Sequence, residues 1–70
     1  MEMKWLDGFS IAIKVENNAV TTSANKQGLL SLANHLTALA QDEAPGTHFH
    51  LDECNSLKEN YTELIVEKTN

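Results

Sequence analysis

The chain has 70 residues, which allows one domain with a small core, since a chain of this size buries only about 60% of its unfolded surface. Ten acidic residues against five lysines give a formal net charge of −5, and arginine is absent, so the composition argues against nucleic acid as a partner. The single cysteine, Cys54, excludes an internal disulfide and fits a reducing compartment.

The N-terminus has no basic region followed by a long apolar run, and no stretch approaches the roughly 20 apolar residues of a membrane span. We therefore expect a cytoplasmic protein of one domain, residues 1–70, without a membrane partner. The three glycines are scattered, so no phosphate-binding loop is present. A negative field would favour a basic protein as partner, because opposite charge speeds encounter.

Residues 1–8 precede the first predicted strand. Within them, Trp5 and Leu6 fit either a short extra strand or an N-terminal arm that closes one end of the core, and we favour the arm.

The first two strands are predicted from alternating apolar residues and a turn between them. A two-residue turn at Asn17-Asn18 would pair Val15 with Val20, since asparagine tolerates the positive φ of hairpin turns. The apolar positions that alternate ahead of this turn are Phe9, Ile11, Ile13 and Val15.

A helix of about 15 residues is predicted next. Ser23 or Asn25 can cap its start, Gly28 weakens its first turn, and residues 45–46, Pro-Gly, prevent its continuation. Leucine and alanine recur at spacings of three and four, which places them on one stripe that we expect to face the sheet. The stripe comprises Leu29, Leu32, Ala33, Leu36, Leu39 and Ala40. His35 lies beside it and is expected at the edge of the core, partly wet.

Two further strands follow the helix, in residues 47–52 and 63–68, and their inward residues are predicted to be Phe49 with Leu51 and Leu64 with Val66. The order ββαββ predicts an α+β domain of two layers, with one helix packed on a four-stranded, mainly antiparallel sheet. The sheet face away from the helix is open to solvent or to a partner. By alternation it carries Ser10, Ala12, Lys14, Thr21, His48, His50, Glu63, Ile65 and Glu67.

The two histidines of GTHFHLDE could form a metal site with a carboxylate from a neighbouring strand. The simpler interpretation is that alternate residues of an open strand face are polar, so we expect no metal and no cofactor. No enzyme is indicated either, because alternation and the following loop direct Cys54, His50 and Asp52 differently.

Acidic residues cluster in the C-terminal third, where apolar anchors accompany them. This composition suits binding of a basic protein. The candidate partner-binding residues are His48, His50, Asp52, Glu53, Tyr61, Glu63, Ile65 and Glu67.

With the elements placed, residues 28–68 resemble a family of small bacterial immunity proteins from polymorphic toxin systems, immunity protein 32. The resemblance rests on the order of a helix reading GLLSLANHL, then GTHFHLD, then a polar stretch and ELIVEK. It implies a cytoplasmic antidote that binds and blocks a cognate toxin domain without catalysis of its own. It carries over no contact residue.

Our hypothesis from the sequence is therefore a non-catalytic binding protein, an immunity protein in the first place. An alternative is a small structural or regulatory homodimer that buries the open sheet face. A third is a metal-binding domain through His48 and His50.

Overall fold

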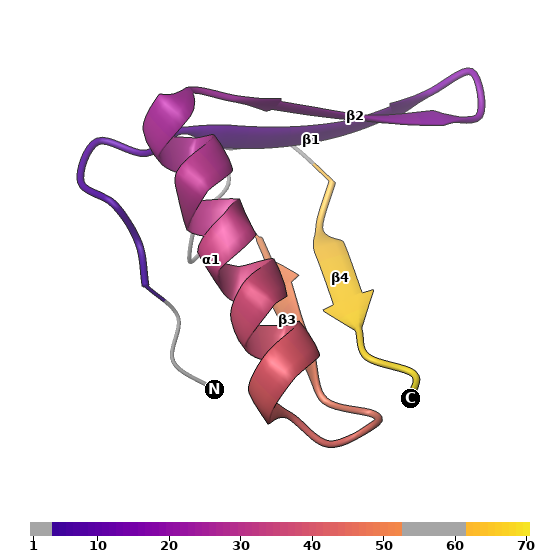
Figure 1. The fold of residues 1–70 in the computed structure, drawn as a ribbon. Helices are drawn as coiled ribbons and strands as arrows, with labels where there is room; N and C mark the ends of the chain where they lie inside the picture. Colours follow the sequence, from indigo (N-terminus) through magenta and orange to yellow (C-terminus); the bar gives the residue numbers. More distant parts are fainter. Residues whose placement is uncertain (1–3, 53–61) are drawn as a thin grey trace.

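The computed structural model describes residues 4–52 and 62–70, and Figure 1 shows how their elements are arranged. In chain order the elements are β1 (Ile11–Glu16), β2 (Ala19–Ala24), α1 (Lys26–Asp42), β3 (His48–Leu51) and β4 (Leu64–Glu67). The predicted ββαββ order and the α+β class are confirmed. The described part of the chain contains no helix with the length and apolar character needed to traverse a lipid bilayer.

The hairpin of β1 and β2 has the predicted turn and register. Val15 pairs with Val20, and Asn17 and Asn18 have φ values of 50° and 64°, as a type I′ turn requires. Both valines are more than half exposed, because the tip of the hairpin extends past the helix (Figure 1).

The prediction of one four-stranded sheet is wrong. The strands form two antiparallel sheets of two strands each, β1–β2 and β3–β4. In Figure 1 the hairpin crosses the N-terminal end of α1, whereas β3 and β4 run alongside the helix. Strands that cross in this way cannot share one continuous ladder. Among the described residues, a backbone hydrogen bond of 3.0 Å links β1 to the segment just before β4, from the N–H of Thr62 to the carbonyl of Ile13.

The core lies between α1 and the inner faces of both sheets. Its buried cluster comprises Ile11, Ile13, Leu39, Phe49 and Leu51. Trp5 packs against this cluster and stacks on Phe9, with ring centroids 4.5 Å apart. The N–H of Leu6 donates to Oγ of the buried Ser31 at 2.8 Å. Residues 4–8, the described part of this segment, contain no strand and contact the core through Trp5.

The side that the helix turns to the core is only partly the one predicted, since Leu39 of the stripe is buried and Leu32 packs against the core cluster. Leu29 and Leu36 of the predicted stripe are 55% and 43% exposed, and both alanines of the stripe are exposed as well. His35 is fully buried and not at the edge of the core. The buried side comprises Gly28, Ser31, His35 and Leu39.

Gly28 accounts for this rotation. A Cβ at this position would meet the carbonyl oxygen of Ser10 well inside the van der Waals limit, and would lie 3.0 Å from Cγ1 of Ile11. The helix therefore approaches the hairpin closely at Gly28, and the residues one, two and three turns further along face the core with it. Asn25 caps the helix, since its Oδ1 accepts a hydrogen bond from the N–H of Gly28 at 2.8 Å.

Candidate functional site

The outer face of β3 and β4 gathers most of the predicted partner-binding residues. Alternation turns Phe49 and Leu51 of β3 into the core, where both are buried, and leaves the intervening side chains outside. The outer face carries His48, His50, Asp52, Glu63, Ile65 and Glu67. The other two candidates, Glu53 and Tyr61, lie outside the described residues.

The register of the two strands decides which of these side chains meet. His48 lies opposite Glu67, and His50 lies opposite Ile65. Two further backbone hydrogen bonds, 2.7 and 2.9 Å long, join Lys68 to the turn before β3. The pairing therefore continues past the ends of both strands and fixes the backbone beneath this face.

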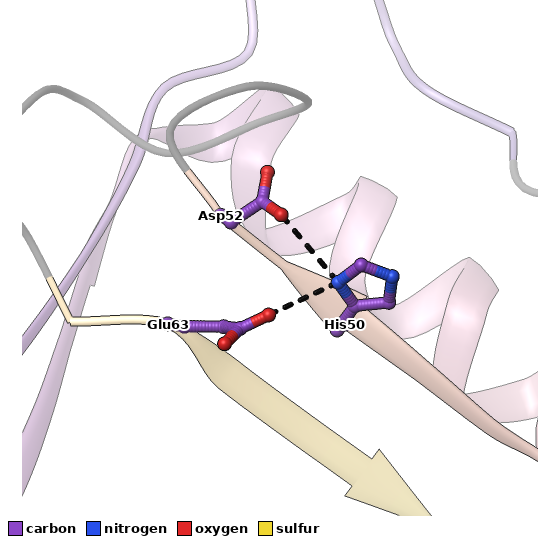
Figure 2. A group of neighbouring side chains, drawn as sticks. All are labelled: His50, Asp52 and Glu63. Carbon is purple, nitrogen blue, oxygen red and sulfur yellow. Dashed lines mark hydrogen bonds and ion pairs between the residues drawn. The ribbon is translucent and has the colours of Figure 1, made fainter.

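His50, Asp52 and Glu63 form a compact group at one end of the face (Figure 2). Nδ1 of His50 lies 3.1 Å from Oε2 of Glu63 and 3.5 Å from Oδ2 of Asp52. One potential ligand atom from each residue lies within 4.8 Å of the other two. The side chains of His50, Asp52 and Glu63 are 51%, 31% and 48% exposed, so water screens their attraction and the group contributes little to stability.

This group combines an imidazole with two carboxylates and contains no hydroxyl or thiol. It can orient the imidazole ring by hydrogen bonding to Nδ1, or present three ligands of the kind that transition metals accept. It does not form a nucleophile–base pair of the kind that acyl transfer needs.

The rest of the outer face combines an apolar side chain with charge. Ile65 is 60% exposed and stands in the sequence between Glu63, which precedes β4, and Glu67 at the end of β4. The ring of His48 lies 6.5 Å from the ring of His50, measured between centroids. An exposed branched side chain flanked by polar groups resembles the anchor and rim of a protein interface.

A separate hollow of about 560 Å³ lies over the hairpin. Its described lining is Ser10, Ala12, Lys14, Thr21, Ser23, Ala24 and Asn25. Ala12, which we expected to be exposed, is buried. Sequence reasoning missed Ser23, although the alternation that places Thr21 on this side also places Ser23 there. Lys14 is the titratable group in the described lining, so the hollow offers no acid–base pair there.

Comparison with known proteins gives one family. A family model described as Immunity protein 32 matches residues 19–69, which is well over half of the chain. The match extends the region of resemblance to include β2. Neither the curated proteins nor the solved structures give a match.

Proposed function

The chain belongs to the immunity protein 32 family, and from that premise we propose that it neutralises a cognate bacterial toxin by binding it, without catalysing a reaction. The family match over residues 19–69 is the observation that carries this proposal. The net charge of −5 supports a basic toxin domain as the partner, since opposite fields steer association. We place the action in the cytoplasm, where a lone cysteine stays reduced.

The contact surface that we propose is the outer face of β3 and β4. Ile65 supplies an apolar anchor at 60% exposure, and the acids on either side of it supply charge for lysine and arginine of the toxin. The two-strand ladder holds these side chains in a fixed register, which limits the entropy lost on binding.

Co-expression tests the function. The chain is expected to rescue cells that produce the toxin-like C-terminal domain encoded in the neighbouring reading frame, and the two purified proteins should form a complex. Neutralisation should require stoichiometric amounts, because a binding antidote is not regenerated as an enzyme is. If no neighbouring toxin domain exists, or the chain neither binds nor protects, the proposal fails.

Charge reversal tests the surface. Glu67→Lys should weaken the complex about tenfold or more and reduce its association rate, because it places repulsion at the interface. Glu16→Lys makes the same charge change on the hairpin, where Glu16 pairs with Lys14 in an exposed ion pair, and should have a much smaller effect. Equal effects of the two variants would remove the assignment of this face.

Sedimentation at micromolar concentration separates this proposal from the alternative of a homodimer through the same face. A monomer would leave the outer face of β3 and β4 available to the toxin. A dimer that Glu67→Lys dissociates would favour the alternative.

A further inference from the structure

We propose that His50, Asp52 and Glu63 bind one first-row transition metal ion, with Zn²⁺ as the ion expected. This site is a property of the isolated chain and does not depend on toxin binding.

The separations of the ligand atoms fit such an ion. Zinc bonds to imidazole nitrogen and carboxylate oxygen are about 2.0 to 2.2 Å long, which places tetrahedral ligands about 3.3 to 3.6 Å apart. Nδ1 of His50 lies 3.5 Å from the nearest oxygen of Asp52, within this range, and 3.1 Å from that of Glu63, slightly below it. The third separation, between the two carboxylates, is within 4.8 Å and closes by rotation of the partly exposed side chains.

The backbone of the site is fixed by the fold. His50 stands between Phe49 and Leu51, which are 3% and 0% exposed and anchor β3 in the core. Glu63 immediately precedes β4, whose first residue pairs with Leu51. Figure 2 shows the three side chains converging from the two neighbouring segments. Ligands on a fixed scaffold need only small side-chain adjustments to bind an ion, and this favours a defined site.

The donor set selects the ion. Mg²⁺ and Ca²⁺ prefer sites made of oxygen ligands, whereas an imidazole nitrogen beside carboxylates suits Zn²⁺ and its neighbours in the first transition row. The two carboxylates together balance the charge of a divalent ion. Three protein ligands leave a fourth position for water, as in zinc sites that are open to solvent.

Without an ion, the same distances describe a histidine hydrogen-bonded to Glu63, and titration with Zn²⁺ distinguishes the two interpretations. Calorimetry should give one equivalent bound, and imidazole ¹H–¹⁵N spectra should report ligation at Nδ1 of His50. Loss of a group that only orients a metal ligand weakens metal binding about 10- to 100-fold. Loss of a ligand itself should weaken Zn²⁺ binding at least as much. This loss is expected for His50→Gln and for Glu63→Gln.

Each site variant has a matched control on the same face, from the same or the directly adjoining segment. His48→Gln removes an imidazole two residues from His50, and Glu67→Gln removes a carboxylate four residues from Glu63. Both controls should bind Zn²⁺ within about threefold of the unaltered chain, well below the tenfold threshold for a changed ligand. Absence of Zn²⁺ binding, undiminished binding by His50→Gln, or equal losses in the controls would overturn the proposal. Failure of the metal site would leave the toxin-binding proposal untouched, because co-expression rescue is measured independently.

Discussion

Nζ of Lys68 donates a hydrogen bond of 2.9 Å to the carbonyl oxygen of Ala40, in the last turn of α1. The same ammonium group donates to the carbonyl of Glu43 at 2.7 Å. The last carbonyls of a helix lack partners within it and carry the negative end of its dipole. Since Lys68 directly follows β4, its side chain ties the last strand to the C-terminal end of the helix.

Lys68→Gln should therefore destabilise the fold by about 1 to 2 kcal/mol, through loss of two charge-assisted hydrogen bonds and of the favourable interaction with the helix dipole. Urea unfolding followed by circular dichroism measures this change. Lys14→Gln is the control, because it removes an equal charge from an exposed ion pair on the hairpin and should cost less than about 1 kcal/mol. Equal losses would mean that net charge, and not the helix end, is responsible.

Gly28→Ala is expected to change the stability of the fold in the direction opposite to the one that helix propensity predicts. Replacing glycine by alanine inside a helix ordinarily stabilises by about 1 kcal/mol. Here the added methyl group would meet the Ser10 carbonyl and lie 3.1 Å from Cβ of Ala24. Gly28→Ala should therefore destabilise by about 1 to 3 kcal/mol, as overpacking does.

Asn34→Ala is the control for Gly28→Ala, because Asn34 is exposed in the same helix. It should stabilise by a few tenths of a kcal/mol, since alanine has the higher propensity and no contact is lost. Thermal unfolding of both variants at one pH makes the comparison. A more stable Gly28→Ala would contradict the close approach of helix and hairpin.

The hairpin and the helix boundaries could be predicted because local chemistry fixes them. Asn17 and Asn18 accept positive φ, which sets the register of every pair in the hairpin. The rotation of the helix could not be predicted in this way. The leucine stripe has the spacing of a core face, but the contact of Gly28 with the hairpin is tertiary, and it buries His35 while leaving Leu36 exposed.

The sequence predicts which residues share the outer face of β3 and β4, but not that His50, Asp52 and Glu63 come together on it. Alternation is local, so it places His50 and Glu63 outside from sequence alone. The 3.1 Å between Nδ1 of His50 and Oε2 of Glu63 depends on the register of β3 and β4. Residues 53–61 separate these segments in the sequence, so the register cannot be read from a two-residue turn as it can in the hairpin. The division into two sheets likewise depends on how the hairpin crosses the helix.

Asn25 connects three parts of the chain, and this leads to a graded prediction. Its Oδ1 accepts from the N–H groups of Gly28 and Ser10, at 2.8 and 3.0 Å, and its Nδ2 donates to the carbonyl of Gly8 at 2.8 Å. Asn25→Ala should cost about 2 kcal/mol, since a lost cap costs about 1 and further hydrogen bonds are lost with it.

Asn25→Asp separates the two roles of this side chain. An aspartate keeps the oxygen acceptors and is favourable at a helix N-terminus, but it cannot donate to Gly8. It should lose less than half of what the alanine variant loses in urea unfolding. If both variants lose the same stability, the bond to Gly8 and not the cap is the main contribution.

His35 should make the stability of the fold depend on pH. Its side chain is fully buried, and its ring packs edge-on against Trp5 at 4.3 Å and against Phe49 at 5.6 Å, between centroids. Within residues 4–52 and 62–70, neither ring nitrogen has a hydrogen-bond partner. Burial lowers the pKa of His35 from its ordinary value of 6.5, because the charged ring loses its hydration.

The sign of the effect follows from proton binding. Below pH 6.5 the unfolded chain takes up a proton at His35 and the folded chain does not, so stability falls as the pH decreases from 6.5 toward the lowered pKa. Well above pH 6.5 both states are neutral at this residue, and it makes no pH-dependent contribution. Urea unfolding at pH 7.5 and pH 5.5, two values chosen about one unit on either side of the ordinary pKa, measures the effect.

His35→Leu should be at least as stable as the unaltered chain at the higher pH, because it removes two buried nitrogen atoms that have no partner among the residues the structure describes. It should also lose less stability on acidification, since the remaining acids and histidines titrate in both proteins and only His35 differs. Equal losses of stability by His35→Leu and the unaltered chain between the two pH values would contradict the prediction. They would mean that His35 binds protons alike in the folded and unfolded chains, despite its burial against Trp5 and Phe49.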